Sequence, residues 1–179
     1  MKKLSKVLVF VVAICCALPI PAFAAENNMD LQLQDEKPVI VSVETVNENL
    51  AAKYDYSSVF PLQLRSTVDL SNGTSTFGVG NLKANETYTT DTYTITKSKI
   101  KIGLQSLSGA SEHIKVTLYK SNGSSVATAN LSLPWTSLSS GTAQYVSFDN
   151  LDSSKKYYAV IKNIDTVQSG NIIGVAKQA

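Results

Sequence analysis

Two carboxylates near the C-terminal end of the chain are the most closely spaced pair that could do chemistry. Asp149 and Asp152 bracket Asn150 and Leu151. Two carboxylates can hydrolyse a glycosidic bond when roughly 5 to 10 Å separates them across a cleft, and their oxygens also suit calcium. Asp and Asn side chains more often cap backbone amides in turns. We favour the turn role. Calcium held by Asp149 and Asp152 is a less favoured alternative, because the sequence lacks the spaced acidic loop of a dedicated calcium site.

The chain has few histidine and cysteine residues that could act as catalytic groups or metal ligands. The chain has one histidine, His113, and two cysteines, Cys15 and Cys16. A serine or cysteine hydrolase needs a base beside its nucleophile, and a zinc site usually needs several His or Cys ligands. We expect His113 to be a solvated loop residue just before a strand, and the protein not to be an enzyme.

Aromatic side chains offer a third kind of site. Trp135 is the only tryptophan, and eight tyrosines include Tyr119 and Tyr145. Aromatic rings in loops or on outward strand positions can stack on sugars, but they also plug core ends and stabilise strands. Trp135, Tyr119 and Tyr145 are therefore candidate ligand-binding residues, with a structural role as the alternative for each.

The first 25 residues predict a secretory signal peptide. Three lysines within the first six positions precede an almost wholly apolar run from Leu8 to Leu18. Pro19 and Pro21 interrupt that run before it reaches the length of a transmembrane helix. We expect cleavage near Ala24 or Ala25, a secreted product and no stable membrane insertion. Both cysteines leave with the signal, so no disulfide is expected.

Charge is unevenly spread along the mature chain. Removing the three signal lysines reduces 16 basic residues to 13, against 14 acidic ones. Residues 26–95 hold 10 acids and 4 bases, whereas residues 96–179 hold 4 acids and 9 bases. Nucleic-acid binding needs denser positive charge than this. We favour complementary halves of one solvated domain and expect no nucleic-acid partner.

Short alternating runs predict strands from position 38 onward. Val, Ile, Thr and Tyr recur in runs broken by Asn, Gly, Asp and Ser, and no window keeps a helical period. The pattern predicts an all-β fold: an antiparallel β-sandwich of jelly-roll or Greek-key type with about nine strands. Residues 38–179 form the single domain, preceded by a flexible lead-in over residues 26–37.

Two Asn-Gly pairs predict hairpins with defined registers. A two-residue turn at Asn122-Gly123 pairs Leu118 with Ala127 and Ile114 with Leu131, all apolar. A similar turn at Asn72-Gly73 pairs Val68 with Phe77 and Leu70 with Ser75. Since a one-residue slip would put the apolar side chains in water, the pattern favours both hairpins.

The order of elements from Tyr88 to Val175 resembles the bacterial pre-peptidase C-terminal-like domain, a small secreted jelly roll. The stretches that carry the resemblance are Tyr93–Ile95, Ile100–Ile102, Val116–Tyr119, Phe148–Leu151 and Lys156–Ile161. Such domains usually accompany a protease or another catalytic domain, for which this chain has no room. The resemblance therefore implies the architecture and no functional residue.

Three functions remain on this evidence. The first is a non-catalytic extracellular or cell-surface protein that binds glycan, cell-envelope polymer or protein. The second is a structural or self-assembling matrix protein, a homo-oligomer that pairs through exposed strand edges and its acidic and basic halves. The third is a carboxylate-based glycan hydrolase. The first is our leading hypothesis.

Overall fold

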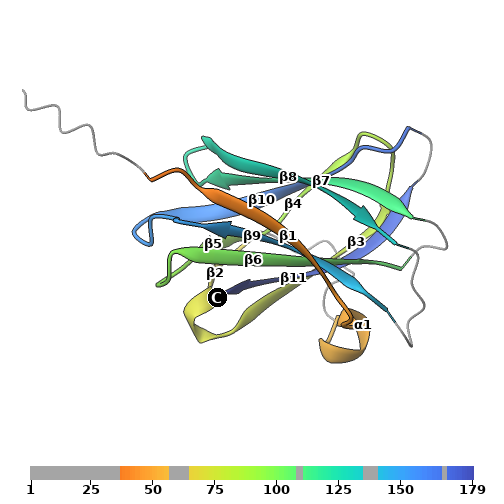
Figure 1. The fold of residues 1–179 in the computed structure, drawn as a ribbon, viewed down its shortest axis with the longest axis horizontal. Coiled ribbons are helices and arrows are strands. Elements are labelled where there is room, and N and C mark those ends of the chain that lie inside the picture. Colours follow the sequence, from red (N-terminus) through yellow and green to blue (C-terminus); the bar gives the residue numbers. More distant parts are fainter. Residues whose placement is uncertain (1–36, 57–64, 108–110, 135–140, 167–168) are drawn as a thin grey trace, which may run out of the picture. The chain divides into compact units, whose positions relative to one another are not determined.

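The computed structural model describes residues 37–56, 65–107, 111–134, 141–166 and 169–179. These ranges contain eleven strands, one short helix and one 3-10 turn (Figure 1). The elements are β1 (Ile40–Val46), α1 (Leu50–Lys53), β2 (Thr67–Asp69), η1 (Leu70–Asn72), β3 (Thr74–Leu82), β4 (Thr87–Thr89), β5 (Thr92–Thr94), β6 (Lys99–Ser106), β7 (Glu112–Lys120), β8 (Ser125–Leu133), β9 (Ala143–Asp149), β10 (Lys156–Asn163) and β11 (Gly170–Gln178). The prediction of about nine strands was too low, because three-residue strands such as β4 are too short to show alternation.

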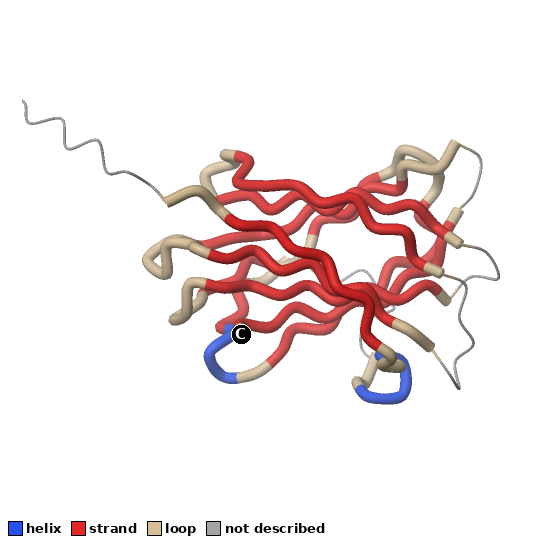
Figure 2. The backbone as a smooth tube through the Cα atoms, in the orientation of Figure 1, coloured by secondary structure: helices blue, strands red, loops and turns tan. Residues whose placement is uncertain are grey.

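The strands form two sheets, which confirms the predicted β-sandwich (Figure 2). Sheet A has the order β1-β9-β6-β11-β3, and sheet B has the order β2-β5-β10-β7-β8, with β4 also paired to β10. The pairing is antiparallel except between β2 and β5, which run parallel. The predicted antiparallel sandwich thus carries one parallel pair, at the edge of sheet B.

The strand order is that of a jelly roll. One sheet contains β3-β11-β6-β9 and the other β5-β10-β7-β8, and from β5 onward every connection except the β7–β8 hairpin changes sheet. Two Greek keys wound together give this alternation. The additional strand β1 lies beside β9 at the edge of sheet A.

Side chains from the inner faces of both sheets form the main core. Alternation directs one side of each strand inward, and the inward positions hold most of the Ile, Val, Leu and Phe residues. Fully buried members from both sheets include Ile100, Ile102, Leu104, Ile114, Val116, Leu118, Val146, Phe148, Ile161 and Ile172.

A second apolar cluster lies on the outer face of sheet A. Tyr145, Ile173 and Val175 belong to it, and Leu50 of α1 is fully buried against them. Asn49 caps α1 by accepting a hydrogen bond from the Ala52 backbone amide. Sheet A is thus covered on both faces near α1.

The structure confirms the predicted register around Asn122-Gly123, although the turn differs. Leu118 pairs with Ala127, and Ile114 with Leu131, as predicted. The Gly123 amide donates to the Lys120 carbonyl, and within this turn only Gly123 has a positive φ, of 88°. These features belong to a three-residue loop, which shifts the pairing by one residue. A bulge between the Leu118 and Tyr119 pairs restores the register.

The predicted hairpin at Asn72-Gly73 was wrong. Strand β2 pairs with β5 in sheet B, whereas β3 pairs with β11 in sheet A. Between them Asp69 accepts a hydrogen bond from the Ser71 amide at 2.9 Å and starts η1. Leu70 of η1 is 1% exposed. Burial of Leu70 at the passage between the sheets thus prevails over the local preference of Asn-Gly for a tight turn.

The predicted signal peptide, residues 1–25, and nearly all of the predicted lead-in, residues 26–37, lie outside the described residues. In the part of the chain that is described, no helix has the length and apolarity needed to cross a bilayer.

Candidate functional site

The structure separates the two tyrosines that the sequence proposed as ligand-binding residues. Tyr119 lies on β7 and points outward from sheet B, because its neighbour Leu118 belongs to the core. Tyr145 lies on β9 and points outward from sheet A, into the second apolar cluster. They are therefore on opposite faces of the sandwich. Trp135, the third candidate, lies outside the described residues.

Tyr145 is a packing residue. It is 1% exposed, and its ring lies over Gly103, where an added Cβ would be 2.5 Å from Cε1 of the ring. Its hydroxyl donates to the carboxylate of Glu48. A side chain this enclosed presents no ring face to an external ligand.

Tyr119 forms a stacked pair with Tyr158 on the outer face of sheet B. Tyr158 of β10 is the direct cross-strand partner of Tyr119. The ring centroids are 5.3 Å apart, and the ring planes meet at 10°. Both residues are partly exposed. Because stacked cross-strand pairs hold each other upright, the two phenols form a fixed aromatic ridge.

A pocket of about 250 Å³ lies where the β7–β8 turn meets the β9–β10 connection, and its lining reaches the core residues Leu151 and Tyr157. Ser125, which lines the pocket, is the cross-strand partner of Tyr119. The lining combines the apolar side chains of Val39, Val126 and Leu151 with Lys37, Lys120, Ser124, Ser125, Asn150, Asp152 and Tyr157. A partly apolar wall with a few polar groups is typical of sites for small polar ligands.

The pocket has a well-anchored wall on the β9–β10 side. Asn150 adopts a positive φ of 63°, and its amide donates to the Pro38 carbonyl at 3.2 Å. The Tyr157 hydroxyl donates to the Asp152 carbonyl at 3.0 Å. These contacts join the start of β1 to the β9–β10 connection, so the pocket is formed before any ligand arrives.

The two aspartates proposed as calcium ligands have separate partners. Asp149 pairs with Lys99, with 3.0 Å between Oδ1 and Nζ. Asp152 caps the Ser154 amide at 2.9 Å, and hydrogen bonds from Ser154 hold the pKa of Asp152 below its ordinary value. Both roles match turn and sheet chemistry. In the described ranges, no group of three or more His, Cys, Asp or Glu side chains is placed to hold a metal.

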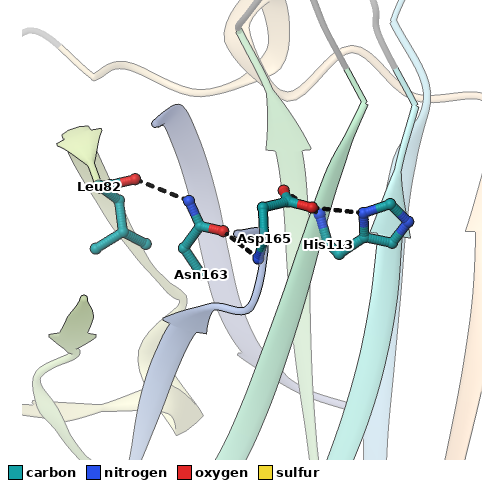
Figure 3. Close-up of polar contacts among 4 residues, drawn as sticks. All are labelled: Leu82, His113, Asn163 and Asp165. Atoms are coloured by element: carbon teal, nitrogen blue, oxygen red, sulfur yellow. Dashed lines mark hydrogen bonds and ion pairs between the residues drawn. The ribbon is translucent and has the colours of Figure 1, made fainter. Parts of the chain in front are cut away.

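His113 lies in β7 and not in a loop, so its predicted position was wrong, but its side chain is exposed as predicted. Its Nδ1 is 2.7 Å from one carboxylate oxygen of Asp165, and its backbone amide donates to the other at 2.9 Å (Figure 3). Asn163 in turn accepts from the Asp165 amide and donates to the Leu82 carbonyl. The imidazole is thereby oriented with Nε2 away from Asp165.

The His113–Asp165 pair has a serine beside it. Ser132 of β8 is the direct partner of His113. The His113 backbone amide donates to the Asp165 carboxylate, and the His113 carbonyl accepts from the Ile164 amide. His113 and Ser132 are therefore a non-hydrogen-bonded pair, the arrangement in which cross-strand side chains lie closest. The described contacts include no hydrogen bond from the Ser132 hydroxyl to His113. We therefore assign the pair to strand anchoring.

A pair of lysines completes the outer face of sheet B. Lys115 of β7 and Lys162 of β10 are direct cross-strand partners. Nothing in the sequence alone pairs these positions, because residues 47 positions apart become neighbours only in the folded sheet. Tyr158 was missed as the partner of Tyr119 for the same reason.

Comparison of the chain with family models, curated proteins and solved structures found no match. The resemblance to pre-peptidase C-terminal-like domains thus stays a prediction.

Proposed function

We propose that this protein is a secreted, non-catalytic interaction protein that binds glycan at the cell surface through the outer face of sheet B. The observation that carries the proposal is the Tyr119–Tyr158 ridge beside a preformed pocket. Sugar rings present C–H groups that pack on aromatic faces, while hydroxyls need nearby polar partners. The ridge supplies the aromatic faces. The serine-lined pocket, whose lining includes Lys120 and Tyr157, the chain neighbours of the two tyrosines, supplies polar partners.

The rest of that face supports the same role. Thr128 is exposed beside the ridge, and its hydroxyl shares a hydrogen bond with that of the buried Thr117, with 3.1 Å between the two oxygens. Asn130 and Ser132 are exposed farther along β8. Short polar side chains on a rigid sheet offer hydrogen bonds at a small loss of side-chain entropy. A shallow polar surface of this kind suits an extended glycan.

The proposal is tested by titrating the mature protein with a panel of soluble glycans in a calorimeter. Tyr119→Ala and Tyr158→Ala should each weaken binding at least tenfold, and Tyr119→Phe should keep most of it because the ring remains. Tyr145→Phe, on the opposite face, is the matched control and should bind as the wild type does. Equal affinity of wild type and Tyr119→Ala would refute the proposal.

A second function, self-assembly, is favoured by the exposed edge strand β1. Ile40 is 56% exposed and Val43 is 48% exposed, and β1 has a paired neighbour on only one side, β9. An apolar edge of this kind can pair with another chain. Sedimentation over a range of concentrations tests it: Val43→Lys should abolish any association, and a strictly monomeric wild type would exclude this function.

A further inference from the structure

We propose that the glycan is an acidic polysaccharide and that Lys115 and Lys162 bind its carboxylates. This inference rests on the proposed glycan-binding function and adds the chemical class of the ligand. Its starting point is an unfavourable arrangement. Like charges directly opposite each other on a sheet destabilise it, and the Lys115–Lys162 pair has that geometry.

No carboxylate in the described structure neutralises these two lysines. Neither Lys115 nor Lys162 takes part in an ion pair or a side-chain hydrogen bond among the described residues. Asp165, close to them in sequence, directs both carboxylate oxygens to His113. Glu86 accepts a hydrogen bond from the Lys83 amide at 3.0 Å. The two ammonium groups therefore remain available to an external anion.

The lysine pair lies on the same surface as the aromatic ridge. Side chains of β10 at positions 156, 158, 160 and 162 share the outward face, since Tyr157, Ala159 and Ile161 are in the core. Lys162 lies four positions after Tyr158, or about 13 Å along the strand. One ligand that contacts both must be an extended oligomer.

Basic residues are the only charged groups on the central outward positions of this face. The outward positions of β7, β8 and β10 hold Lys115, Lys156, Lys162 and His113, and no Asp or Glu. The carboxylate of Asp165 lies against His113, and a surface with an excess of positive charge attracts anions and steers their approach. The basic C-terminal half noted in the sequence thus places part of its charge on the glycan-binding face.

Acidic polysaccharide fits this combination better than other polyanions. Nucleic acid binders neutralise many phosphates with dense Lys and Arg, and here three lysines stand on a face with no arginine. In a chain of sugar rings with regularly placed carboxylates, the rings can pack on the tyrosine ridge while the carboxylates bind the lysines.

The test compares polygalacturonate oligomers with their methyl-esterified, neutral counterparts in the same calorimeter. The double variant Lys115→Gln, Lys162→Gln should bind the acidic oligomer at least tenfold more weakly and with less dependence on salt. Its binding of the neutral oligomer should be unchanged. Lys83→Gln, Lys97→Gln removes the same charge elsewhere and should match the wild type.

Melting temperature shows whether the variants fold. The double variant should melt at the same or a higher temperature, because a like-charge contact is removed. An equal loss of affinity for the acidic oligomer in the two double variants would assign the effect to net charge and overturn the inference. So would tighter binding of polyphosphate or single-stranded oligo(dT) than of polygalacturonate by the wild type.

The two proposals fail in different ways. If Tyr119→Ala abolishes binding of the neutral oligomer while the lysine variant still binds the acidic one normally, the acidic-ligand inference alone is wrong. If the wild type binds neither oligomer nor any other glycan, both proposals are wrong.

Discussion

The carboxylate of Glu48 accepts a hydrogen bond from the Tyr145 hydroxyl, with 2.7 Å between the two oxygens. Its other oxygen is bound by the ammonium group of Lys53, at the end of α1. Lys177 lies over the Tyr145 ring, 4.6 Å from the centroid. Glu48 therefore joins the segment before α1 to the outer face of sheet A and fixes the cover of the second apolar cluster.

Because of this arrangement, we expect the protein to lose stability at acidic pH. Burial raises the pKa of Glu48, but hydrogen bonds from Lys53 and Tyr145 lower it more, so the net pKa is below the ordinary value of 4.5. The stabilisation is present above 4.5 and is lost as the pH falls through the lower folded-state pKa, because the unfolded state binds the proton more tightly. Urea midpoints measured from neutral to acidic pH should fall less for Glu48→Gln than for the wild type. Parallel curves would contradict this role.

The close approach of Tyr145 to the sheet requires glycine at position 103. A Cβ there would lie 2.5 Å from Cε1 of Tyr145, so Gly103→Ala must displace the ring from Glu48. We expect a loss of about 1–3 kcal/mol in the free energy of unfolding, as for other overpacked sites, measured by urea denaturation. In a Tyr145→Ala background the same substitution should cost much less, and an equal cost in both backgrounds would exclude the ring as the cause.

The β7–β8 loop requires positive φ at Gly123. Its φ of 88° is a conformation that residues with a Cβ rarely adopt, and an added Cβ meets nothing within 4 Å. Gly123→Ala should therefore report backbone strain alone and cost about 1–2 kcal/mol in unfolding free energy. Ser121→Ala in the same loop is the control and should change the free energy by less than about 0.5 kcal/mol.

The passage from β2 to β3 should depend on Leu70 and not on the Asn-Gly pair. Leu70→Ala removes a side chain that is 1% exposed and should cost about 2–5 kcal/mol. Among the described residues, the Asn72 side chain donates only to the exposed Asp69 carboxylate, so Asn72→Ala should cost about 1 kcal/mol or less. Chemical denaturation of both variants decides the matter, and a larger loss for Asn72→Ala would restore the hairpin interpretation.

Much of the fold could be predicted because the face of each strand residue is a local property. Side chains alternate between the faces of a strand whatever its partner is. The inward positions of β6, β7 and β10 follow from this rule, and so does the register around Asn122-Gly123, where the partner strand comes next in the chain. The turn role predicted for Asp152 agrees with its cap on the Ser154 amide, whereas Asp149 lies in β9 and pairs with Lys99 across the sheet.

The same rule explains the failures, because alternation shows which residues point inward but not which sheet they point from. Val68 and Phe77 both face the core, and the sequence pattern is the same whether their strands pair in a hairpin or lie in opposite sheets. Tyr119 and Tyr145 look alike in sequence, yet one lies on an open face and the other under a helix.

The sequence by itself determined that the chain forms short strands with an apolar side that faces the main core, and it determined the register of the β7–β8 hairpin. Only the tertiary structure decided which strands became neighbours, and with them the Tyr119–Tyr158 and Lys115–Lys162 pairs. The physical reason is that pairing between distant strands is selected by burial of the whole core, a sum over many contacts that no short segment contains.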